Sequence, residues 1–277
     1  MSPHLIPHRF PRLAYILFGG MLGILIIATG NASLAKSGTN HGSAEIGSTQ
    51  KDDGLNHTLD RPLVLIKESM KAYSEIKDYK CTLFQLERFK GKMQPENVIT
   101  VQSMTQPFAI HMKWSEPRSS RGQEAIYNPT KDIKNMRVKG AGLLGAVGFI
   151  TLDIKDPKAC ANNRHTIDEA GFENLIKRLH DGWEEDAKRK GGTQVSISFA
   201  TVHDKECERV ELTHPESQDG YFLFYKNIVY FDKVSRLPLK IENYSWPKDG
   251  EPAPLEESIS YKDLVVNTGI DAAVFQK

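Results

Sequence analysis

The spacing of apolar residues changes near residue 79, from a helical repeat to strand alternation. Before that point apolar side chains recur every three or four positions, which is typical of a helix with one apolar stripe. Asp60 can cap the start of this helix, and Pro62 fits its first turn. The members of the stripe are Leu63, Ile66, Met70 and Tyr73.

Beyond residue 79, apolar and polar side chains alternate, which predicts antiparallel strands with one wet face. The clearest alternation covers residues 109–114, 195–200 and 237–242. Turn formers such as Lys90-Gly91-Lys92 separate the segments. The further predicted strands are residues 81–89, 96–104, 123–128, 133–139, 206–214, 221–226, 228–232 and 255–266.

A second helical stripe interrupts the strands. Thr166 and Glu169 form a capping box, and Gly191-Gly192 ends the segment. The stripe consists of Phe172, Leu175, Ile176, Leu179 and Trp183. This order predicts an α+β fold: a strongly curved antiparallel sheet, an open and incomplete β-barrel, with two helices packed on its concave side as a lid.

The first 58 residues differ from the rest of the chain. Residues 1–35 carry a basic start, an apolar run and a small-residue site, which predict a signal peptide cleaved after Ala35. An uncleaved membrane anchor is the alternative, because the apolar run is nearly long enough to span a bilayer. Residues 36–58 are polar and predict a flexible linker, so residues 59–277 form one folded domain. The domain is therefore expected outside the cytoplasm, in the periplasm or cell envelope, and anchored to the membrane if the first segment stays attached.

The net charge and the cysteine content limit which partners and disulfides are expected. Lys and Arg number 36 against 35 acids, and removal of residues 1–35 deletes two arginines, which leaves −1. Without a basic excess, nucleic acid is not an expected partner. Of Cys81, Cys160 and Cys207, two can pair in an oxidising compartment; Cys160 with Cys207 is the preferred pair, although the sequence leaves the pairing open.

No catalytic or metal-binding motif is present in the sequence. It contains no G-x-S-x-G elbow, phosphate-binding glycine loop or HExxH. His203, Cys207 and His214 are close in sequence but are expected on both faces of the sheet, so no metal site is predicted. Residues 184–190 are interpreted as the solvated end of the second helix. We expect no cofactor and no enzyme activity.

Several segments together resemble a known family. Residues 163–172 (NRHTIDEAGF) and 231–244 (FDKVSRLPLKIENY) are the more specific, and 84–88, 107–114, 261–264 and 271–275 agree. Over residues 59–275 the chain resembles a bacterial exported domain of unknown function that is similar to the LolA/LolB lipoprotein carriers. The resemblance implies an unclosed barrel around an apolar cavity with helices as a lid.

This resemblance and the strand alternation suggest a cavity that holds a lipid or another apolar or lipidated ligand. The alternative is that the same side chains simply pack into a core. A non-enzymatic, lipoprotein-carrier-like protein is the leading hypothesis, and an envelope sensor or protein interaction module without a ligand is the alternative. The predicted cavity lining is Phe84, Leu86, Ile110, Met112, Trp114, Val195, Ile197, Phe199, Leu239 and Ile241.

Two further segments are candidates for the mouth of the cavity. Residues 140–150 are uncharged, glycine-rich and too short to span a bilayer, so they are interpreted as a flap that contacts a membrane surface or a partner, or else as a plain buried loop. Arg164 and His165 are candidate rim residues for an anionic headgroup or an envelope protein, or else make only local contacts. The flap residues are Leu143, Leu144, Val147 and Phe149.

Overall fold

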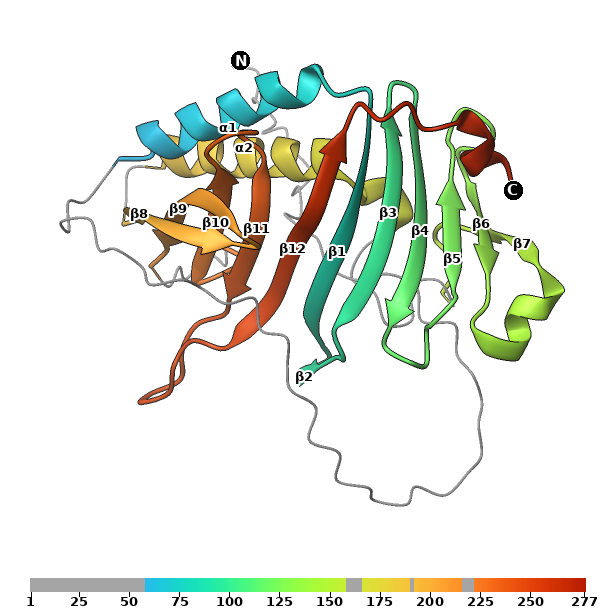
Figure 1. Cartoon of the computed structure of the whole chain (residues 1–277). Helices are drawn as coiled ribbons and strands as arrows, with labels where there is room; N and C mark the ends of the chain where they lie inside the picture. Colours follow the sequence, from blue (N-terminus) through green and yellow to red (C-terminus); the bar gives the residue numbers. More distant parts are fainter. Residues whose placement is uncertain (1–57, 158–165, 190–191, 216–221) are drawn as a thin grey trace, which may run out of the picture.

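The computed structural model describes residues 58–157, 166–189, 192–215 and 222–277 (Figure 1). The described helices are α1 (Asp60–Ser74) and α2 (Phe172–Lys188). Short 3-10 helices are η1 (Gly142–Val147), η2 (Ile167–Glu169) and η3 (Ala272–Gln276). The strands are β1 (Asp78–Phe89), β2 (Lys92–Met93), β3 (Asn97–Thr105), β4 (Phe108–Glu116), β5 (Glu124–Tyr127), β6 (Asn135–Lys139), β7 (Phe149–Asp153), β8 (Gln194–Val202), β9 (Lys205–Thr213), β10 (Lys226–Asp232), β11 (Pro238–Tyr244) and β12 (Leu255–Val266).

The strands form a single antiparallel sheet in the order β7-β6-β5-β4-β3-β1-β12-β11-β10-β9-β8, and β2 pairs with β1 beside this path. Within the described residues β7 and β8 do not pair with each other, so the barrel is open. Both helices lie across the sheet (Figure 1). The predicted fold, an open antiparallel sheet with two packed helices, is confirmed.

The core lies between the helices and the central strands. Phe172, at the start of α2, is fully buried between two tyrosines of the sheet. Its ring centroid lies 5.2 Å from that of Tyr79 on β1 and 4.3 Å from that of Tyr261 on β12. Farther along α2, the Trp183 ring lies 6.1 Å from Phe231 of β10. The apolar stripe of α2 therefore bridges strands from the middle to the curled end of the sheet.

Helix α1 packs against α2 and is fastened to the sheet by polar contacts. The Arg61 guanidinium donates two hydrogen bonds, of 2.8 and 2.6 Å, to the Glu208 carboxylate of β9. The Ser69 hydroxyl donates to the carbonyl of Arg236. This contact turns Ser69 inward, and Met70, a predicted member of the stripe, is 43% exposed.

The starts of the two helices differ from the predicted ones. Leu59 rather than Asp60 is the cap of α1, and no side chain makes a capping bond there. Thr166 precedes the short turn η2, and α2 begins at Phe172 after Gly171. Gly171 has φ +97°, and a Cβ at this position would lie 3.1 Å from the Tyr79 hydroxyl oxygen. The glycine therefore lets the chain pass close to β1 before the helix begins.

Further predictions from the sequence can be compared with the residues that the structure describes. Residues 222–225, inside the predicted strand 221–226, are not in a strand, and β10 begins at Lys226. The predicted signal peptide (1–35), the predicted linker apart from Thr58, and Cys160 lie outside the described residues. Neither described helix has the length and apolar character needed to cross a membrane.

Cys81 and Cys207 are buried free thiols. The preferred pairing of Cys160 with Cys207 is therefore wrong in this structure. Burial raises the pKa of the Cys207 thiol to about 12, and the pKa of Cys81 is also raised by burial. Both thiols behave as small apolar side chains of the core.

The Asp78 carboxylate ties the chain after β12 to the start of β1. It accepts hydrogen bonds from the Thr268 N–H at 2.7 Å, the Thr268 hydroxyl at 2.9 Å and the Gly269 N–H at 3.0 Å. Burial alone would raise the pKa of this carboxyl, but the hydrogen bonds outweigh burial and hold the pKa below its usual value.

Replacing Asp78 with asparagine should lower the free energy of unfolding by about 1–3 kcal/mol at pH 7, because charge-assisted bonds are lost. A depressed folded pKa stabilises above the unfolded pKa, and this stabilisation is lost as pH falls through the folded pKa. The difference from the parent should therefore shrink below pH 4. Urea unfolding at neutral and acid pH measures it, with the exposed Asp249→Asn as control; equal stability of D78N and parent at pH 7 would contradict the expectation.

Candidate functional site

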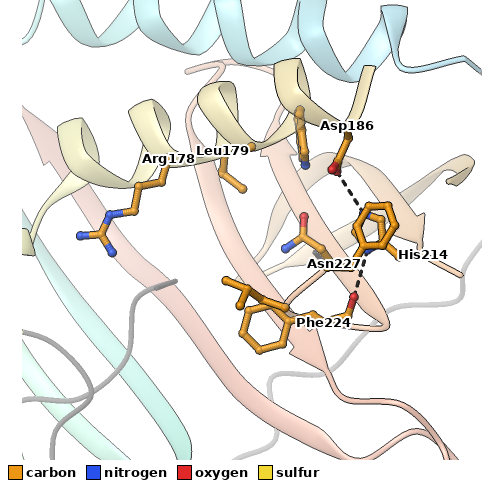
Figure 2. A pocket seen from close by; sticks show the side chains of 10 residues that line it. Arg178, Leu179, Asp186, His214, Phe224 and Asn227 are labelled. Carbon is orange, nitrogen blue, oxygen red and sulfur yellow. Dashed lines mark hydrogen bonds and ion pairs between the residues drawn. The ribbon is translucent and has the colours of Figure 1, made fainter. Parts of the chain in front are cut away.

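A pocket opens beside α2, next to the connection between β9 and β10 (Figure 2). Residues four apart on α2 form one wall, and the segment before β10 forms the other. The cavity volume is about 70 Å³ and the pocket is open to solvent. The lining residues are Arg178, Leu179, Gly182, Trp183, Asp186, His214, Phe222, Leu223, Phe224 and Asn227.

His214 joins the two walls of the pocket. Its Nε2 lies 3.1 Å from Asp186 Oδ2, and its Nδ1 lies 3.1 Å from the carbonyl oxygen of Phe224 (Figure 2). The ring is therefore held between a carboxylate on α2 and a backbone carbonyl of the segment before β10. The Phe222 ring stacks on the imidazole, with centroids 4.4 Å apart, so His214 also positions the aromatic wall.

A row of buried polar side chains leads from the pocket across the face of the sheet. The Asn227 side-chain amide donates to Asn243 Oδ1 at 2.6 Å, and the Asn243 amide donates to Glu257 Oε1 at 2.5 Å. The next strand continues the row with Glu87, which is opposite Glu257 in register. These four side chains are at most 5% exposed. Within the described residues Asn227 Oδ1 has no hydrogen-bond donor, so the pocket end of the row has an unused acceptor.

Arg178 supplies a positive charge at the other end of the pocket from His214 (Figure 2). Its guanidinium donates to the Glu169 carbonyl at 3.3 Å and lies 3.6 Å from the Glu169 carboxylate. Burial lowers the pKa of Arg178, and the carboxylates of Glu169 and Glu257 act in the opposite direction. The site thus combines an apolar wall with one guanidinium, which suits a ligand with an anionic end and an apolar end.

Most of the predicted cavity-lining residues lie in the core beneath the helices. They belong to the same cluster of buried side chains as Leu65 and Ile66 of α1 and Phe172 and Leu179 of α2. The helices therefore occupy the space that these side chains face, and a contact with ligand stays a prediction. The residues are Ile110, Met112, Trp114, Val195, Ile197, Leu239 and Ile241.

Three of the predicted lining residues lie elsewhere. Phe84 and Leu86 point away from the buried face of β1, and the Phe84 ring lies 5.4 Å from that of His203. The alternation was read in the wrong phase because the helix-facing residues of this part of β1 include polar Gln85 and Glu87. Phe199 is 44% exposed beneath the Lys233 ammonium, which lies 4.3 Å from the ring centroid.

The predicted flap lies at the opposite edge of the sheet from the pocket. Residues 142–147 form η1 between β6 and β7, whereas the pocket borders β9 and β10. Leu143, Leu144 and Val147 are exposed, and Phe149 packs partly buried beside Phe275. The flap therefore does not border this pocket. The predicted rim residues Arg164 and His165 lie outside the described residues.

The sequence interpretation missed the residues that build the pocket. Asp186 was assigned to a solvated charge run, yet it is only 9% exposed and pairs with His214. A signal was present, because Asp186 continues the stripe of Leu179 and Trp183 at helical spacing. Phe222, Phe224 and Asn227 carried no such signal, since they follow a strand end and their meeting with α2 depends on the fold.

The family described as Protein of unknown function (DUF1571) matches residues 76–277. The chain belongs to this family. No curated protein matches the sequence. Membership in the DUF1571 family therefore classifies the chain but assigns no activity to it.

Solved structures resemble the DUF1571 chain in fold. An uncharacterised conserved protein from Thermus thermophilus has 9% identity and a TM-score of 0.44, covering 79% of this chain and 94% of that one. The lipoprotein LppX from Mycobacterium tuberculosis has 12% identity and a TM-score of 0.43, covering 76% and 98%. A LolA superfamily protein from Nitrosomonas europaea has 12% identity and a TM-score of 0.29, covering 77% and 96%. At these scores the likeness does not indicate a shared function.

Proposed function

We propose that this chain is an exported, non-enzymatic binding protein for an amphiphile, either a lipid or the acyl group of a lipid-modified peptide. The observation that carries the proposal is the composition of the pocket beside α2. Leu179, Trp183 and Phe224 provide an apolar wall, and Arg178 provides a positive charge at one end. A ligand whose anionic head group meets this guanidinium can lay its acyl chain against the apolar wall.

The pocket holds one end of such a ligand. Its volume of about 70 Å³ is below the 300–1,000 Å³ of typical small-molecule sites. Burial of about four methylenes would contribute roughly 3 kcal/mol before ordering costs. The remainder of the chain would lie along the mouth, where Leu223 is 44% exposed. A modest affinity of this kind suits a carrier that must release its cargo.

In this proposal the ligand sits at the border of the concave face rather than at its centre. The predicted lining residues, such as Met112 and Ile241, form the floor under α1 and α2. A ligand would contact them only if a helix moved away from the sheet. The predicted signal segment, residues 1–35, supports a site of action in the periplasm or cell envelope.

Filling the pocket provides the test. Gly182 lies in the pocket wall on α2, so Gly182→Leu should place a side chain in the cavity without removing a core contact. Ala187→Leu adds the same bulk to an exposed site on the same helix and is the matched control. Uptake of a fluorescent sixteen-carbon fatty acid by the full chain should fall about tenfold or more in the first variant, which corresponds to about 1.4 kcal/mol, and remain unchanged in the second.

Two outcomes oppose the proposal. Equal uptake by both variants would move the binding site away from the pocket. If the parent chain took up no fatty acid, and mass spectrometry found no lipid in its organic extract, the proposal of lipid binding would be contradicted. The same fold would then be better explained as an envelope sensor or a protein interaction module.

A further inference from the structure

An apolar tip projects from the edge of the sheet, away from the pocket. We define it as residues 142–150, comprising η1 and the first residues of β7 (Figure 1). Four of its side chains are strongly exposed: Leu143 (94%), Leu144 (45%), Val147 (73%) and Ile150 (49%). No charged residue occurs from position 140 to 152. The tip is therefore a continuous apolar surface rather than one isolated exposed side chain.

The backbone holds this tip in a compact turn. A Cβ at Gly140 would lie 2.6 Å from Leu144 Cβ, so only glycine permits this close return of the chain. Gly148 has φ +80°, and its N–H donates to the Gly145 carbonyl at 3.1 Å. At the base of the tip, Phe149 packs partly buried against the cluster of Ala109, Ile126 and Phe275. The leucines and valine are thus presented outward by an anchored loop.

Positive charges accompany the tip. The antiparallel order places the end of β4, the start of β5 and the end of β6 at the same end of the sheet, where η1 leaves. Four bases lie in these segments against two acids, Glu116 and Glu124. Lys139 pairs with Glu124 and Arg121 with Glu116, whereas Lys113 and Arg118 are exposed. The four bases are Lys113, Arg118, Arg121 and Lys139.

We propose that the apolar tip enters the surface of an anionic lipid bilayer, with the neighbouring bases facing the headgroups. A projecting tip is suited to insertion, and nine residues are too short to cross the hydrocarbon core. An apolar insertion combined with a basic surface gives the two contributions that stable interfacial binding needs. This inference concerns a different site from the pocket, and it holds whether or not the pocket binds an amphiphile.

A tryptophan reporter tests the position of the tip. The full chain carrying Leu143→Trp is mixed with phosphatidylglycerol and phosphatidylcholine vesicles that contain brominated lipid. Val234→Trp is the matched control, because Val234 is 89% exposed and lies in the turn between β10 and β11. Subtraction of the parent spectrum removes the emission of the native tryptophans.

The added emission at position 143 should be quenched, more by bromines near the headgroup than by those near the chain end, since an interfacial segment enters only about 5–10 Å. Emission at position 234 should be unchanged. Absence of quenching at 143, or equal quenching at both positions, would overturn the proposal.

The charge contribution is tested in the same reporter. Lys113→Gln with Arg118→Gln should reduce quenching at position 143 in vesicles that contain phosphatidylglycerol. In vesicles of phosphatidylcholine alone, the parent and this variant should give the same, weaker quenching. Quenching that is unaffected by the two substitutions in anionic vesicles would overturn the requirement for anionic lipid. Fatty-acid uptake by the pocket should be unchanged in all of these variants, so the two proposals fail separately.

Discussion

Phe172→Ala should lower the free energy of unfolding by about 3–5 kcal/mol, as expected when a large buried ring is truncated. Phe172 is fully buried and contacts the Tyr79 and Tyr261 rings, one on each of two paired central strands. Its removal leaves a cavity where α2 meets β1 and β12, and neither tyrosine can fill it without moving its own strand. Urea-induced unfolding followed by circular dichroism measures the loss.

Phe199→Ala is the matched control for this substitution. The same atoms are removed, but Phe199 is 44% exposed and contacts mainly the Lys233 ammonium. We expect a loss of about 1 kcal/mol or less, the usual range of an exposed cation–π contact. If the two variants unfolded at the same urea concentration, α2 would not be packed on the sheet as the structure has it.

Asp186→Ala should cost about 1–3 kcal/mol, because it leaves the buried Nε2 of His214 without its hydrogen-bond partner. Both side chains are nearly buried, and their contact links the last turns of α2 to the end of β9. Asp181→Ala, on the same helix, removes the contacts of a more exposed carboxylate with Lys177 and His180 and should change stability by less than about 1 kcal/mol. The two unfolding curves make the comparison directly.

A double-mutant cycle separates the pair from its surroundings. Asp186→Ala combined with His214→Phe should be less destabilising than the sum of the single changes, because the second change removes the ring nitrogen that the first leaves without a partner. Fatty-acid uptake should also fall in Asp186→Ala, since His214 positions Phe222 and Phe224. Strict additivity of the two single changes would show that the imidazole and carboxylate do not interact.

The sequence was sufficient for the fold class because its two periodicities are physically distinct. The stripe from Phe172 to Trp183 specifies a helix, and the alternation in residues 109–114 and 237–242 specifies strands. The predicted wet face is wrong for most of β11, where Lys240 and Glu242 are buried along with the apolar residues. The start of α2 was misplaced by several residues. The Thr166 and Glu169 pattern fits a capping box, but tertiary packing of Gly171 against Tyr79 decides where the helix begins.

The candidate site was harder to predict because polar side chains occupy buried positions on the strands beside it. In β1 the buried positions include Gln85 and Glu87, so an interpretation that places polar residues outside assigns Phe84 and Leu86 to the wrong face. The row of polar side chains is formed across strands. Pairing of β10 with β11 places Asn227 opposite Asn243, and pairing of β11 with β12 places Asn243 opposite Glu257. Their positions in sequence contain no shared spacing that would bring them together.

The place of β12 in the sheet has a consequence for the order of folding. Strand β12 lies between β11 and β1, so the two halves of the described sheet are joined by residues that are synthesised after its other strands. Until Leu255–Val266 is available, β1 and β11 each have an unpaired edge, and such edges promote aggregation. Contacts between residues far apart in the sequence also slow folding. The connectivity therefore requires β1 and β11 to wait for β12 before the sheet becomes continuous.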